Sequence, residues 1–137
     1  MFLNLLSDRQ KQSFLALATK VVMADGEVVP EENVTLKVRV AEMGGQIKAP
    51  PDEIYGEANF DVFDTPQSQT IIILELMVIA YSDAEYHENE RPIIDDLIKH
   101  FGFTADQIAR FEDWAKRQSP LSVEGWGFIT ESGPVAE

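Results

Sequence analysis

Two short acidic segments carry carboxylates at a spacing that could hold a divalent cation. Residues 24–32 read ADGEVVPEE, and residues 82–90, found 58 positions later, read SDAEYHENE. Both fit the pattern D-x-E-x-x-x-x-E, whose acidic positions are Asp25, Glu27, Glu32, Asp83, Glu85 and Glu90. Calcium and magnesium take oxygen ligands, and a bound cation relieves the repulsion between clustered carboxylates. The repeated spacing therefore predicts loops that present oxygen atoms to a divalent cation or to a basic partner.

The first segment does not fit the EF-hand calcium loop. That loop needs oxygen ligands at positions 1, 3 and 5, a glycine at position 6 and a glutamate at position 12. Counted from Asp25, the glycine falls at position 2 and Val29 occupies position 5. The alternative to any ligand role is structural, because aspartates close turns and glutamates are favourable at the positive N-terminal ends of helices.

Composition narrows the classes of function. The chain has 137 residues and a formal net charge of −13, which argues against nucleic acid as a partner. It has no cysteine, which excludes disulfides and thiolate zinc sites, and its two histidines are too few for a histidine-rich centre. The apolar run at 71–80 is too short to span a membrane, and residues 1–6 do not resemble a signal peptide. We therefore expect a cytoplasmic protein without membrane insertion.

Helix signals divide the chain. A capping box at Ser7 predicts a helix that runs into the first acidic segment, and Thr65-Pro66 opens the long apolar helix. Residues 34–40 alternate like a strand but also make a helical stripe of Val34, Val38 and Ala41, and the matching second half favours helix. Residues 46–65 read as a connector with a short helix near 52–57.

The second half gives further helix signals. Apolar residues at helical spacing run from Ile93 to Phe101 and stop at Gly102, and Thr104 begins another capping box. Glu75 interrupts the apolar helix, where it either faces solvent, pairs with a lysine or arginine, or is a buried acid. His100, near a helix end, is interpreted as a favourable contact with the helix dipole.

These signals predict an all-α fold: a bundle of about five to seven helices with an internal helix–acidic loop–helix pseudo-repeat. Residues 1–118 form the helical domain, and 119–137 are expected to be an irregular C-terminal tail because they contain prolines and glycines. Trp126 and Phe128 are expected to fix the first half of that tail to the body.

The chain resembles the TerB-like family, which is linked to tellurite resistance. The resemblance rests on the order Ala-Asp-Gly-Glu-Val-x-x-Glu-Glu after an alanine-containing helix, and on a similar segment in the second half of the chain. The likeness covers about residues 8–118. It implies an all-helical bundle, divalent-cation binding and a cytoplasmic stress response that includes complexes at the inner face of the membrane. It adds Glu31 to the candidate ligands. Ala84 stands where the phrase usually has glycine, so the second loop is the weaker candidate.

The function expected from these observations is non-enzymatic. A TerB-like domain would bind calcium or magnesium through its acidic loops, and would dock on basic surfaces of stress-response or membrane-associated proteins. One alternative is an acidic interaction module that needs no metal. A hydrolase using carboxylate-held metal ions is the third interpretation, but no nucleophile or phosphate-binding loop stands out.

Overall fold

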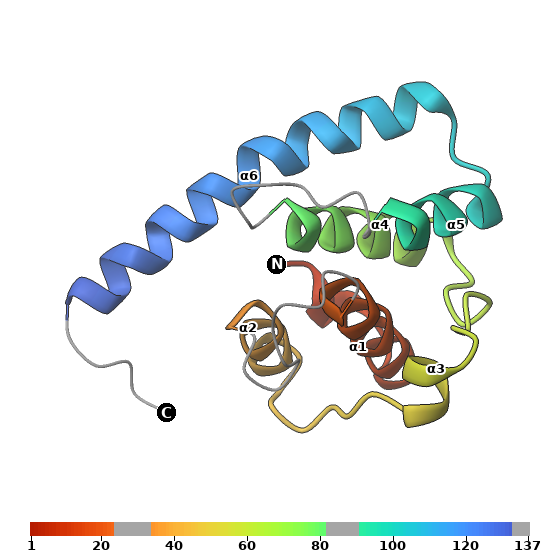
Figure 1. The fold of residues 1–137 in the computed structure, drawn as a ribbon, viewed down its shortest axis with the longest axis horizontal. Helices are drawn as coiled ribbons and strands as arrows, with labels where there is room; N and C mark the ends of the chain where they lie inside the picture. The colour runs from red at the N-terminus through yellow and green to blue at the C-terminus, as the bar shows by residue number, and fades with distance from the viewer. Residues whose placement is uncertain (24–33, 82–90, 133–137) are drawn as a thin grey trace.

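The computed structural model describes residues 1–23, 34–81 and 91–132. All the regular structure in these ranges is helical, which confirms the all-α prediction (Figure 1). The elements are the 3₁₀-helix η1 (Leu3–Leu5) and the α-helices α1 (Asp8–Met23), α2 (Val34–Glu42), α3 (Pro51–Tyr55), α4 (Pro66–Ala80), α5 (Arg91–Phe101) and α6 (Ala105–Glu131).

The predicted helix starts are confirmed by hydrogen bonds. The backbone N–H of Gln10 donates to Ser7 Oγ at 3.2 Å, and Gln10 Oε1 accepts from the Ser7 N–H at 3.0 Å. Thr65 caps α4 in the same reciprocal manner with Ser68, and Thr104 caps α6 with Gln107. Each capping box satisfies backbone donors that the first turn of a helix leaves without partners.

The two halves share a frame that repeats at the offset of the acidic segments. The cap residues Ser7 and Thr65 are 58 positions apart, as are Gly44 and Gly102, which follow α2 and α5. Both glycines have positive φ, at 107° and 76°. The unit 7–44 therefore recurs as 65–102, with the same type of start and the same type of stop.

The buried positions repeat at the same offset. Matched pairs that are buried in both halves include Phe14 and Ile72, Val21 and Ile79, and Leu36 and Ile94. The pseudo-repeat therefore extends from the caps to the buried positions of the core.

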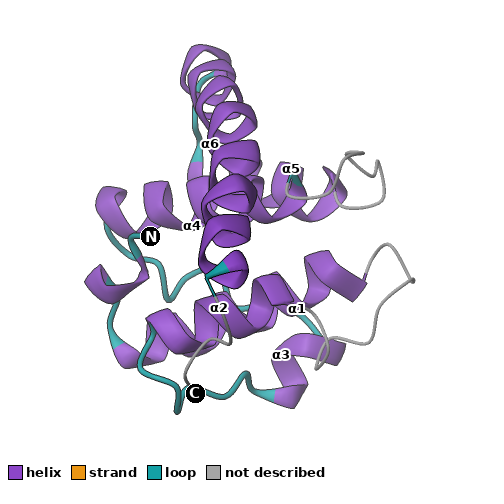
Figure 2. Cartoon of the chain, turned by 90° about the vertical axis from the view of Figure 1, so that its left-hand side faces the viewer, coloured by secondary structure: helices purple, strands orange, loops and turns teal. Residues whose placement is uncertain are grey.

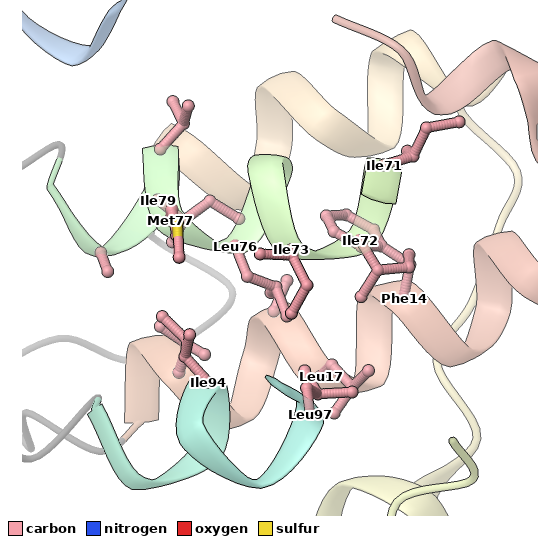
Figure 3. Packing of buried hydrophobic residues seen from close by; sticks show 14 of the residues in the cluster. Phe14, Leu17, Ile71, Ile72, Ile73, Leu76, Met77, Ile79, Ile94 and Leu97 are labelled. Carbon is pink, nitrogen blue, oxygen red and sulfur yellow. The ribbon is translucent and has the colours of Figure 1, made fainter. Parts of the chain in front are cut away.

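Helix α4 lies at the centre of that core. It is apolar around its whole circumference, and it packs against α1, α5 and α6. Figure 3 shows Ile73 and Leu76 pointing from α4 toward the layer formed by α1 and α5, where Leu17 and Leu97 meet. A helix that is apolar on every side must be covered on every side, which explains why the other helices surround it.

The segment with the ambiguous pattern is helical, as the repeat predicted, but Ala41 of the predicted stripe does not reach the core. Ala41 is exposed, whereas Leu36 and Met43 are buried and Val40 packs against the core. The side chain of Val34 is not described. Residues 36, 40 and 43 also have helical spacing, and contact with the core selects this stripe.

The short helix predicted in the connector is α3, and a polar network attaches it to α1. Glu53 is 5% exposed and accepts a hydrogen bond from Ser13 Oγ at 2.7 Å. Arg9 lies 3.0 Å from Glu53 and donates to Ser13 Oγ at 2.8 Å. Each member of the network has partners, so the buried carboxylate is compensated.

The expectation of an irregular segment from Ser119 is not met, because α6 continues to Glu131. Pro120 is exposed within the helix. The φ angle of proline suits a helix, and the carbonyl that loses its partner there can bond to water. Phe128 is 61% exposed and does not fix this segment to the body, and the side chain of Trp126 is not described.

Glu75 is a buried acid with cationic partners. It is 2% exposed, and it accepts from the Phe2 N–H and from the Met1 amino group, each at 2.9 Å. Arg39 Nε lies 3.8 Å from its second oxygen. Burial lowers the pKa of Arg39, and the charges of Glu75 and Glu42 offset part of that shift.

This ion pair marks a departure from the repeat. At the offset of 58, Leu17 corresponds to Glu75 and Arg39 corresponds to Leu97. The apolar pair Leu17 and Leu97, which joins α1 to α5, is thus matched by an ion pair that joins α4 to α2.

We expect Glu75→Leu to destabilise the fold by about 3 kcal/mol, because it leaves Arg39 buried with less counter-charge. The double variant Glu75→Leu/Arg39→Leu should recover most of that loss by recreating the apolar pair of the other half. Urea unfolding of the wild type, both single variants and the double variant measures this. A double variant that is less stable than either single variant would contradict this explanation.

We also expect Gly102→Ala and Gly44→Ala to lower the free energy of unfolding by a similar amount, about 1 kcal/mol each. Open space surrounds both glycines, so the cost would come from positive φ alone. Gly127→Ala, inside α6 and equally uncrowded, is the control and should leave stability unchanged or raise it. Thermal or urea unfolding gives the comparison, and equal effects at all three positions would refute a role for φ.

Candidate cation-binding face

The seven candidate ligands lie outside the described residues. They are Asp25, Glu27, Glu31, Glu32, Asp83, Glu85 and Glu90. The structure instead fixes the helix ends to which the two acidic segments attach. The first segment joins α1 to α2, and the second joins α4 to α5.

Those helix ends are anchored in the core. In the last turn of α1, Val21 and Val22 are 0% and 5% exposed, and at the end of α4 Ile79 and Ala80 are 5% and 1% exposed. Ile94, in the first turn of α5, is 2% exposed. The attachment points therefore have fixed positions, because these side chains would have to leave the core before the helix ends could move.

The end of α1 and the start of α5 border one hollow. Met23, the last residue of α1, lines a depression of about 350 Å³ together with Ile93 of α5 and residues 54–56 of the α3 region. Figure 2 shows the C-terminal end of α1, α3 and α5 on the same side of the molecule. Both acidic segments are thus joined to helices that meet at this hollow.

A second, more polar depression of about 430 Å³ continues the first one. The two share Lys20, Gly56 and Ile93. Its lining includes three carboxylates, which are those of Glu57, Asp61 and Asp96. Lys20 Nζ donates to the Gly56 carbonyl at 2.5 Å, so this cation is already engaged by the protein backbone.

His100 pairs with Asp61 across this depression, and the distance from Nε2 to Oδ1 is 2.9 Å. The ring of Phe60 packs edge-on against the imidazole, with 5.3 Å between centroids. Sequence reasoning assigned His100 to the helix dipole and missed this partner. No spacing signal could have revealed it, because 39 residues separate the two side chains.

The described residues do not make a metal site by themselves. Among them, no group of three or more histidine, aspartate or glutamate side chains is arranged to hold a metal ion. Glu57, Asp61 and Asp96 therefore supply negative potential beside the attachment points of the acidic segments, without forming a coordination shell.

Comparisons with known proteins add no further constraint. No family model, curated protein or solved structure matches this chain. Within the described ranges, no helix is long and apolar enough to cross a membrane.

Proposed function

We propose that this protein is a non-enzymatic helical module that binds a divalent cation, calcium or magnesium, through its two acidic segments. The observation that carries the proposal is the shared offset. The D-x-E-x-x-x-x-E pattern repeats at 58 positions, and so do the caps, the buried residues and the stop glycines around it. In the sequence, the two acidic segments therefore follow and precede described residues that repeat at the same offset, which supports a shared role for them.

Electrostatics supports the same proposal. The chain carries 24 acidic and 11 basic residues, so additional carboxylates gathered on one face repel one another strongly. Three more carboxylates line the second depression, which continues the hollow beside α1 and α5. A bound divalent cation would relieve this repulsion and would hold the two helix pairs in one relative pose.

The resemblance to the TerB-like family supports a cytoplasmic stress-response setting, with tellurite resistance as one example. In that setting the cation-loaded face would dock on basic surfaces of other stress-response or membrane-associated proteins. Asp25, Glu27, Glu31 and Glu32 are the primary ligands under this proposal, because the first segment has Gly26 where the second has Ala84.

A metal-independent acidic docking module is the second candidate, favoured by the net charge of −13 alone. Binding of a basic partner would then weaken steeply with salt and would not respond to a chelator. The cation proposal predicts instead that partner binding requires the loaded metal.

We expect the metal-stripped protein to bind calcium or magnesium with a defined stoichiometry in a calorimetric titration. Asp25→Asn/Glu27→Gln should abolish the main binding event, whereas Asp83→Asn/Glu85→Gln should weaken it less. Asp106→Asn/Asp113→Asn removes the same number of charges from exposed positions in the first half of α6 and serves as the control.

Two results would count against this site. Equal losses of binding in the first-segment variant and the α6 control would indicate diffuse charge attraction. Heat changes without saturation at millimolar cation would leave the acidic docking module as the better account.

We further expect the cation to perturb the residues that border the hollow. In methyl-labelled protein, the Met23 and Ile93 resonances should shift with saturable dependence on calcium or magnesium. Met43 and Ile47, near α2, should shift much less. Perturbation of all four methyl groups to the same extent would argue against a local site and for a general ionic effect.

A further inference from the structure

The C-terminal half of α6 presents an apolar stripe that no described residue covers. Leu121, Phe128 and Ile129 are 60%, 61% and 50% exposed. They lie at relative positions i, i+7 and i+8, which places them on one face of the helix with Gly125 between them. Figure 1 shows this half of α6, which we call the arm (residues 119–131), extending beyond the end of α4.

The stripe continues the face that α6 uses inside its own fold. Trp114, which packs against the core, precedes Leu121 by seven residues, and Phe128 follows after another seven. A face that packs over its first half and is bare over its second half indicates a packing partner outside the molecule.

The arm is also acidic. Glu124 and Glu131 are seven residues apart and flank the stripe along the same edge of the helix. Residues 118–132 contain no lysine or arginine. A partner for the arm must therefore combine an apolar surface with positive charge.

The molecule itself carries such a surface on the other side of its core. A groove of about 670 Å³ lies between α1, α2 and residues 45–49, and its apolar lining includes Leu36, Val40, Ile47 and Ile54. The charged residues that line it are Lys37 and Lys48, both exposed, and none of the described residues lining it is acidic. In a chain of net charge −13, an apolar groove whose described charged lining residues are both lysines is the complement of the arm.

We propose that the groove of one molecule receives the α6 arm of a second copy, and that the exchange is reciprocal. The arm cannot reach the groove of its own chain, because α6 is one continuous helix from Ala105 to Glu131 that leads away from the body. An amphipathic helix of 13 residues, about 20 Å long, in an apolar groove is a common mode of recognition. Two such contacts related by a two-fold axis form a closed dimer.

Charge sets the register of this contact. Two copies that each carry a net charge of −13 repel one another over most of their surfaces. At the point of contact this repulsion is replaced by attraction, because the arm of one copy carries two glutamates and the groove of the other carries two lysines. These residues are Glu124, Glu131, Lys37 and Lys48. Burial of Phe128 and Leu121 would supply most of the affinity.

Sedimentation velocity over a concentration series at physiological salt tests the arm. The wild type should form a dimer, and Phe128→Glu should raise the dimer dissociation constant by about tenfold or more. Leu5→Glu makes the same change at another exposed position, in η1, and should leave the dimer intact. Far-ultraviolet circular dichroism confirms that each variant remains helical.

Mixing two monomeric variants tests the groove. Lys37→Glu/Lys48→Glu reverses the charge of the groove without altering its apolar lining, and should also give a monomer. A mixture of Phe128→Glu and Lys37→Glu/Lys48→Glu pairs an intact groove with an intact arm, so it should form a heterodimer weaker than the wild-type dimer.

Three outcomes would overturn the proposal. If the wild type stays monomeric throughout the series, the groove does not receive the arm of a second copy. The same result is expected if the groove instead binds a fatty acid or a helix of another protein. A dimer that resists Phe128→Glu uses another surface. A mixture that does not associate, although both variants are folded, shows that arm and groove do not meet.

Discussion

The burial of α4 is the constraint on which the rest of the structure depends. This helix is apolar on all sides, so it is stable in water only when other helices enclose it. Helices α1 and α5 cover one side and the first half of α6 covers another. Glu75, the one charged side chain buried in α4, is accommodated because Arg39, the Phe2 N–H and the Met1 amino group all converge on it.

Duplication explains how a short chain encloses that helix. The unit 7–44 and the unit 65–102 have equivalent caps, core positions and stop glycines, and they pack through α1 and α4, their first helices. The next helix along the chain differs between them. After the first unit the chain enters α3, which Glu53 attaches to α1, whereas after the second unit it enters α6, which covers α4. The ion pair of Glu75 and Arg39 is a different kind of departure, because it lies within the repeat itself.

The distribution of charge gives the polar depression and the apolar groove different chemistry. The hollow beside α1, α3 and α5 adjoins helix ends to which the acidic segments attach, and the depression that continues it is lined by three carboxylates. The groove beside α2 is apolar with lysines. The hollow and the groove share Ile54, but the cation proposed at the first and the helix proposed at the second would use different charged residues.

The sequence by itself determined the local structure. The capping boxes at Ser7, Thr65 and Thr104 depend on side chains three residues apart. The helix stop at Gly102 depends on the freedom of one residue to adopt positive φ. Both features can therefore be predicted from the local sequence alone. The acidic ligands remain a prediction. Only the tertiary structure decided which stripe of α2 is buried, how far α6 extends, and which groups pair with Glu75 and His100. The reason is that each of these depends on contacts between residues distant in the chain, which no local spacing encodes.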